Sequence, residues 1–246
     1  MAAIETAMHR IMKTNDMVDV FIAPSEFLRK KVIEYGFKEE KMVHLNYFTD
    51  FDFHEEKETA GNYYLYVGRI SEEKGLKTLI DAAVRVNSCM LKIAGGGPEL
   101  EKMIIYANSK DKNRLIEFLG HKNREEIIGL YKNCKFVVLP SEWYENYPYS
   151  VIEAFASGKP VIGSNIGGIR ELIRDTERGL IFEKGNSEDL RAAINYLLNN
   201  LDITAEMGKN AKIFAEQTLG PEKHYRKLIK VYEQAISKNL NSKEKN

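Results

Sequence analysis

Short apolar segments recur along the chain from residue 63 onward, each followed by a glycine-marked turn and a stretch with helical spacing. Between residues 75 and 86, for example, Leu76, Leu79 and Ile80 fall on one face of a helix. The apolar segments lie roughly 20 to 25 residues apart, which leaves room for a helix between successive strands. Strands are predicted at Tyr63–Val67, Met90–Ala94, Leu115–Leu119, Phe136–Leu139, Pro160–Gly163 and Gly179–Phe182.

The strand segments are almost entirely apolar and alternate with helices. This pattern predicts a parallel sheet covered on both faces, which is the doubly wound α/β architecture. After Asn186 the spacing is helical through Leu190–Leu198, Ala205–Gln217 and Tyr225–Ile236. The polar tail Asn239–Asn246 is expected to be disordered.

The first 48 residues predict a smaller set of elements. They comprise a helix (Ala3–Met12), a strand (Val18–Ala23), a helix that begins after Ser25 and stops at Gly36, and a strand (Lys41–Leu45). Two strands cannot cover a hydrophobic core of their own. We therefore interpret residues 1–48 as the remnant of a preceding α/β domain, residues 49–220 as a complete ligand-binding domain and residues 221–246 as a closing helix and tail.

Length and composition are consistent with this division. The 246 residues fit one large domain plus a fragment, and the 36 Lys and Arg balance the 36 Asp and Glu. Zero net charge argues against broad binding to nucleic acid. The two cysteines and five scattered histidines show no spacing typical of metal ligands, so no metal is expected. Free thiols and the lack of a long apolar run favour a cytoplasmic location.

The unusual residues follow the predicted strands directly. In a doubly wound sheet, ligands bind outside the carboxyl ends of the strands. Five loops at that edge are therefore predicted to form a single pocket: Gly68–Arg69, Gly95–Pro98, Gly120–Lys122, Ser141–Tyr149 and Ser164–Gly168.

The glycine-rich loop Gly95–Pro98 has two interpretations. It is either a tight turn, with Pro98 in the first helical position, or a place where a ligand approaches the backbone closely. A dinucleotide fingerprint would need a sixth-position glycine, where Leu100 stands instead. A dinucleotide-dependent oxidoreductase is therefore disfavoured, and a phosphate loop of the G-x-x-x-x-G-K-[ST] type is absent from the sequence.

Charged residues supply the candidate chemistry. Arg69 and Lys74 lie at a strand end, just before a predicted helix. There the forked guanidinium of arginine and the compact ammonium of lysine could clamp a diphosphate. Considered singly, these two residues would be interpreted as ordinary surface charges. Their position at the strand ends, beside the other marked loops, favours binding of a ligand instead. Glu145 and Glu153 are separated by seven residues, a spacing that is weak evidence by itself. Glu153, however, lies in an apolar helical segment, where a carboxylate needs hydroxyl donors such as those of a ribose.

These segments together resemble a known family. The sequence of residues 140–164, PSEWYENYPYSVIEAFASGKPVIGS, followed by GGIREL at 167–172, is similar to retaining glycosyltransferases of family 4, the group 1 type with the GT-B fold. The loops at 68–75 and 95–98 stand in the order that this family shows. The resemblance covers about residues 19–236 and identifies the C-terminal domain, which binds the nucleotide-sugar donor.

The resemblance implies a role for each matching residue. Arg69 and Lys74 would hold the donor diphosphate and stabilise its charge, Glu145 would face the hexose hydroxyls, and Glu153 would bind the ribose. The implied catalytic residues are thus Glu145, Arg69 and Lys74, with no metal and no cofactor beyond the donor. The implied donor-binding residues are Gly68, Arg69, Lys74, Gly96, Gly120, His121, Asn146, Tyr147, Tyr149, Ser150 and Glu153.

The sequence departs from the family after Glu145. The usual Glu-Gly-Phe-Gly is here Glu145-Asn146-Tyr147-Pro148. Pro148 has no N–H, so the amides of Tyr149 and Ser150 are expected to meet the phosphates. Asn146 in place of glycine narrows the loop, so the family pattern does not predict which sugar the donor carries.

Two hypotheses follow. The leading one is a donor-binding domain that transfers a hexose from a nucleotide-sugar with retention of configuration. It would need a missing N-terminal domain, would be inactive as a truncated chain, and could meet a membrane surface only through its acceptor. The alternative is a non-catalytic nucleotide-sugar binding module that works with a separate partner chain.

Overall fold

The computed structural model describes residues 14–50 and 61–243, which divide into two compact units. One unit holds residues 48–220. The other combines the residues up to 47 with those from 221 onward. The predicted helix at Ala3–Met12 lies outside the described residues, as do residues 51–60.

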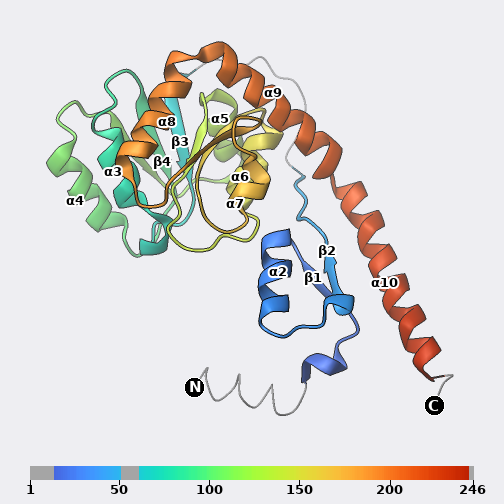
Figure 1. The fold of residues 1–246 in the computed structure, drawn as a ribbon. Coiled ribbons are helices and arrows are strands. Elements are labelled where there is room, and N and C mark those ends of the chain that lie inside the picture. Colours follow the sequence, from blue (N-terminus) through green and yellow to red (C-terminus); the bar gives the residue numbers. More distant parts are fainter. Residues whose placement is uncertain (1–13, 51–60, 244–246) are drawn as a thin grey trace. The chain divides into compact units, whose positions relative to one another are not determined.

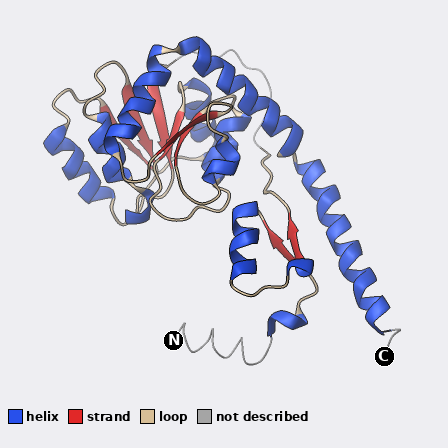
Figure 2. Cartoon of the chain, in the orientation of Figure 1, coloured by secondary structure: helices blue, strands red, loops and turns tan. Residues whose placement is uncertain are grey.

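The larger unit is built on a sheet of six parallel strands in the order β5-β4-β3-β6-β7-β8 (Figures 1 and 2). The chain starts in the middle of the sheet, builds outward to β5, and returns to build the other half from β6. The strands are β3 (Tyr63–Val67), β4 (Met90–Ala94), β5 (Ile116–Gly120), β6 (Val137–Leu139), β7 (Val161–Ser164) and β8 (Gly179–Phe182).

Helices cover both faces of this sheet (Figure 1). The short helix η3 (Glu72–Lys74) follows β3. The longer helices of this unit are α3 (Leu76–Ala83), α4 (Leu100–Lys110), α5 (Arg124–Asn133), α6 (Tyr149–Ala156), α7 (Ile169–Ile173), α8 (Ser187–Asn199) and α9 (Leu201–Thr218).

Alternation along the strands divides the interior into two cores. On β3, Tyr64 and Tyr66 pack with apolar residues of α3, α4 and α8, whereas Tyr63 and Leu65 pack with those of α5, α6, α7 and α9. Successive strand residues point to opposite faces, so a continuous apolar run fills both cores at once. The doubly wound α/β fold predicted from the apolar strands is confirmed.

The second unit contains few elements. A parallel pair, β1 (Phe21–Ala23) and β2 (Met42–His44), accompanies η1 (Thr14–Met17), α2 (Glu26–Glu34), η2 (Glu39–Lys41) and α10 (Pro221–Lys243). The Ser25 hydroxyl accepts a hydrogen bond from the Leu28 amide at 3.1 Å, which caps α2 as predicted. None of the helices in the described ranges combines the length and apolar character needed to cross a bilayer.

Two local predictions were wrong. Helix α10 continues to Lys243, so the polar tail expected to be disordered from Asn239 is mostly helical. Pro98 does not open a helix, because α4 begins at Leu100 after a turn in which the Leu100 amide donates to the Gly97 carbonyl.

Gly95 allows the turn after β4 to pass directly over the turn after β3. Its φ is +147°, and a Cβ added there would lie 1.9 Å from the Gly68 carbonyl oxygen. At Gly96, by contrast, an added Cβ would meet no atom within 4 Å. The loop is therefore a tight turn at Gly95, as one of the two interpretations predicts, and the close approach of a ligand to its backbone stays a prediction.

We expect Gly95→Ala to lower the free energy of unfolding by about 1–3 kcal/mol, because the new methyl group collides with backbone that cannot move independently of the sheet. Gly96→Ala is the matched control and should unfold at nearly the wild-type urea concentration. Equal urea midpoints for both variants would contradict the proposed crowding at Gly95.

Candidate functional site

The first and second halves of the sheet meet between β3 and β6, the point where ligands bind in open α/β sheets. A hollow of about 510 Å³ lies at the carboxyl ends of β3, β4 and β5. We call it the donor-side pocket. Five of the predicted residues line it, namely Gly68, Arg69, Gly96, His121 and Glu153, together with Val67, Ala94, Gly95, Lys122, Arg124 and Ile127.

Glu153 reaches this pocket from α6. Its Oε2 accepts a hydrogen bond from the buried Tyr131 hydroxyl at 3.1 Å. Burial raises the pKa of the Glu153 carboxyl, while the Tyr131 bond and the nearby Arg124 oppose that rise. Burial also raises the pKa of Tyr131, so its hydroxyl stays a donor. The hydroxyl donor that the sequence required for Glu153 is thus supplied in part by the chain itself.

Lys74 and Glu145 join the two halves of the sheet. The Lys74 ammonium donates to Glu145 Oε1 at 2.5 Å, and the Ser141 hydroxyl donates to the same oxygen at 2.8 Å. Both side chains of the ion pair are mostly shielded from solvent, at 25% and 17% exposed. Lys74 follows β3 and Glu145 follows β6, so the pair spans the point at which the strand order reverses.

The loop that carries Glu145 is held by the turn after β7. The Gly168 amide donates to the Glu145 carbonyl at 2.7 Å, and a Cβ added at Gly168 would lie 1.9 Å from the Asn146 carbonyl oxygen. The close approach requires glycine at this position. It fixes the backbone of residues 145 and 146 against the sheet edge.

The other predicted residues are distributed around the α6 start. The Tyr147 ring is 5% exposed and packs in the core beside α6. Tyr149 is 53% exposed, and α6 begins there with Pro148 as its cap and no side-chain cap bond. Ser150 is the next helical residue. Gly120 acts through its backbone, since its carbonyl accepts from the Gly95 amide at 2.8 Å.

The five predicted loops line two of the hollows found among the described residues. A second hollow of about 420 Å³ lies at the ends of β6, β7 and β8 and shares no lining residue with the first. We call it the Trp143 pocket. Its walls are Glu142, Trp143, Tyr144, Asn165, Ile166, Gly167, Glu183 and Lys184. Neither Glu145 nor Gly168, whose backbone groups join the loops after β6 and β7, is among the residues that line these two hollows.

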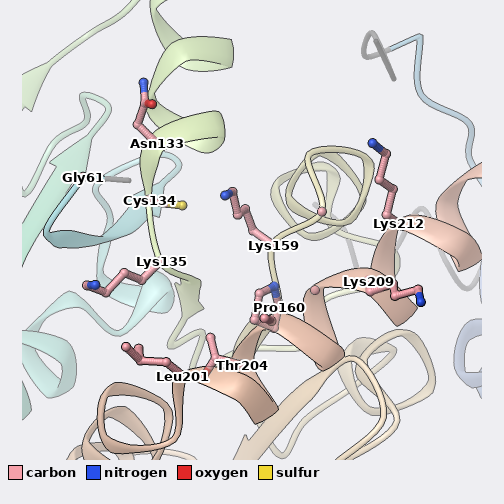
Figure 3. Close-up of a pocket in the computed structure, with 13 residues that line it drawn as sticks. Gly61, Asn133, Cys134, Lys135, Lys159, Pro160, Leu201, Thr204, Lys209 and Lys212 are labelled. Atoms are coloured by element: carbon pink, nitrogen blue, oxygen red, sulfur yellow. The ribbon is translucent and has the colours of Figure 1, made fainter. Parts of the chain in front are cut away.

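A third hollow, of about 390 Å³, lies at the opposite edge of the sheet (Figure 3). Gly61, Lys135 and Pro160 stand before β3, β6 and β7, so this hollow is at the amino ends of the strands. Four lysines line it: Lys135, Lys159, Lys209 and Lys212. Their side chains point in different directions in Figure 3 rather than toward one centre, so they do not form a clamp for an anion.

Sequence reasoning missed Arg124 and Tyr131. Arg124 lines the donor-side pocket and forms an ion pair with Asp50 at 2.7 Å. A signal for Arg124 was present, because Asn123 and Glu126 form a capping box that starts α5 at the sheet edge. Tyr131 carries no comparable signal, since a buried tyrosine on a helix is ordinary core.

Residues 48–214 match the protein family described as glycosyl transferases group 1. An uncharacterised glycosyltransferase of Methanocaldococcus jannaschii is 35% identical over 175 residues, which is 70% of this chain and 48% of that protein. Alpha-D-kanosaminyltransferase of Streptomyces kanamyceticus is 31% identical over 154 residues, covering 60% of this chain and 39% of that one. The chain thus spans about half the length, or less, of these relatives.

Solved structures show the same fold. Sucrose-phosphate synthase of Thermosynechococcus elongatus superposes with a TM-score of 0.80 at 21% identity, covering 94% of this chain and 62% of that one. HepE of Anabaena, crystallised with UDP, superposes with a TM-score of 0.75 at 22% identity, covering 91% and 64%.

The raised pKa of the Glu153 carboxyl predicts how the stability of the fold depends on pH. A folded-state pKa above the unfolded value stabilises the fold at pH values below the unfolded pKa, and this contribution is lost as pH rises through the folded pKa. The Glu153→Gln variant keeps an acceptor for the Tyr131 hydroxyl but cannot ionise. We expect its free energy of unfolding to depend less on pH than that of wild type. The stability of the variant relative to wild type should rise from pH 4 to pH 7 in urea titrations. A constant difference across this range would show that the Glu153 pKa is the same in both states.

Proposed function

Because the chain belongs to the glycosyl transferases group 1 family, we propose that its 48–220 unit binds a nucleoside diphosphate sugar and presents the sugar for transfer to an acceptor. The observation that carries this proposal is the meeting of Arg69, Glu153 and the glycine turns of β3 and β4 in one pocket at the strand ends. That pocket combines a cation, a carboxylate and close backbone, which a nucleoside diphosphate requires together.

Glu153 is proposed to bind the ribose. Tyr131 occupies its Oε2, and Oε1 accepts no hydrogen bond among residues 14–50 and 61–243. A carboxylate oxygen at the floor of a pocket is a strong acceptor for a pair of adjacent hydroxyls. The ribose therefore supplies donors that complete the pairing of a half-buried carboxylate.

Arg69 and Lys74 are proposed to bind the diphosphate. Arg69 is exposed at the pocket edge, and its guanidinium makes no ion pair within the described ranges. Lys74 is held by Glu145, so its ammonium is already oriented before a ligand arrives. A preorganised cation stabilises the charge that develops on the leaving diphosphate.

Transfer is proposed to retain the configuration of the sugar, as the resemblance to family 4 implies. The bond from the anomeric carbon to the diphosphate oxygen breaks, and the acceptor oxygen bonds to the same face of that carbon. The acceptor proton passes to the departing phosphate oxygen. Glu145 would hold the sugar hydroxyls during this exchange, and proton NMR of the first product formed would report its anomeric configuration.

The acceptor site is proposed to lie mostly outside the 48–220 unit. The relatives extend well beyond the matched region, since this chain covers 48% and 39% of two of them. We propose that residues 1–48 correspond to the end of the acceptor domain, residues 49–220 to the donor domain and residues 221–246 to the closing helix and tail.

Nucleotide binding tests the donor proposal directly. Calorimetric titration with UDP, GDP, ADP and NAD should show the tightest binding for a nucleoside diphosphate, with UDP as the first candidate. Arg69→Ala and Glu153→Ala should each weaken that binding by about 1–3 kcal/mol, as expected for a lost charge-assisted hydrogen bond.

Arg191→Ala is the matched control, because Arg191 lies on α8 outside the donor-side pocket and forms an ion pair with Glu188 of the same helix at 2.7 Å. Its nucleotide affinity should equal that of wild type. Tightest binding to NAD, or unchanged affinity in both pocket variants, would contradict the proposed site.

A further inference from the structure

Trp143 is the only tryptophan in the chain and stands largely outside the core. Its side chain is 68% exposed, and that of the adjacent Tyr144 is 57% exposed. Trp143 makes no hydrogen bond or ring contact with any described residue. Large aromatic side chains gain more from burial than other residues do. Two neighbouring exposed rings beside a hollow therefore indicate a surface that a ligand covers.

The walls around these rings are polar. The Asn165 amide donates to Glu183 Oε2 at 3.3 Å, which fixes its orientation. The Asn165 amide oxygen is buried and has no hydrogen-bond partner. On the facing wall, Glu142 Oε1 accepts from the Thr78 hydroxyl at 2.6 Å, and the other Glu142 oxygen remains an acceptor. The Trp143 pocket thus offers flat apolar rings within a border of amide and carboxylate groups.

A pyranose ring has the complementary chemistry. Its C–H faces are apolar and flat enough to stack on an aromatic ring, and its edge carries hydroxyls that donate to carboxylates and pair with amides. An acyl chain would offer no hydrogen bond to the polar groups of this hollow and would leave the Asn165 amide oxygen without a partner, which is costly. The volume of about 420 Å³ is within the range of small-molecule sites.

We propose that the Trp143 pocket binds a sugar ring of a carbohydrate acceptor. The inference rests on the proposed donor function, because an acceptor sugar is needed only if the 48–220 unit transfers a sugar. Glu145 follows Tyr144 directly in the chain, so a sugar stacked on the exposed rings would lie near the residue proposed to hold the transferred sugar. We assign the ring held here to the acceptor because the donor-side pocket, which shares no lining residue with this one, is proposed to hold the donor nucleotide.

The single tryptophan gives a direct readout. Its fluorescence should change saturably on titration with at least one probe from a panel of maltose, lactose, α-mannobiose and chitobiose, at tens of millimolar. Tyr144→Ala should weaken that response about tenfold, which corresponds to about 1.4 kcal/mol and is of the size expected for a lost aromatic contact. Tyr196→Ala is the matched control, because Tyr196 is a 44% exposed aromatic on α8 outside the pocket.

A second measurement does not depend on fluorescence. Saturation-transfer NMR should show contact between the responding disaccharide and the wild-type protein, and Trp143→Ala should abolish it while leaving UDP affinity within twofold. Nucleotide binding without any disaccharide response would overturn the acceptor-sugar proposal and leave the donor function standing. A fluorescence shift with phosphatidylglycerol vesicles and none with the disaccharides would also overturn it, in favour of a lipid surface. Loss of nucleotide binding alone would contradict the donor function.

Discussion

The parallel pairing of β3 with β6 is the constraint on which the site depends. It joins two half-sheets that the chain builds in opposite directions, so the loops after β3 and β6 diverge to the two faces. The Lys74–Glu145 bond then connects those loops across the reversal. The donor-side pocket combines residues that follow β3, β4 and β5 with Glu153 from α6 of the other half-sheet, whereas the Trp143 pocket is lined by residues that follow β6, β7 and β8.

The sheet could be predicted because each strand is marked by apolar residues that are neighbours in the sequence. The strands β3, β4 and β8 occupy the predicted residues, since each is a short segment that is mostly apolar and is bounded by turn residues. Element ends were less predictable. The helix expected from Ala205 begins at Leu201, and α10 continues to Lys243 through residues whose polarity suggested a tail.

The candidate site was predictable where chain position alone decides proximity. Gly68, Gly96 and Glu153 meet because parallel strands end at one edge. The hydrogen bond between the Gly168 amide and the Glu145 carbonyl was not predictable, because a contact between backbone groups leaves no side-chain pattern in the sequence. The role of Tyr131 was not predictable from the sequence either, because its ring is an ordinary part of the hydrophobic core and its hydroxyl alone contacts Glu153.

The Lys74–Glu145 bond also bears on selectivity among phosphates. In the empty site the ammonium already has an anionic partner, so a lone phosphate ion gains little by replacing a carboxylate and leaves that carboxylate without its cation. Under the proposed function, a sugar attached to the diphosphate would change this exchange, because its hydroxyls would donate to Glu145 while the diphosphate bound Lys74. On the same proposal, inorganic phosphate and a nucleotide without the sugar, which lack those hydroxyls, would compete poorly with the intact donor.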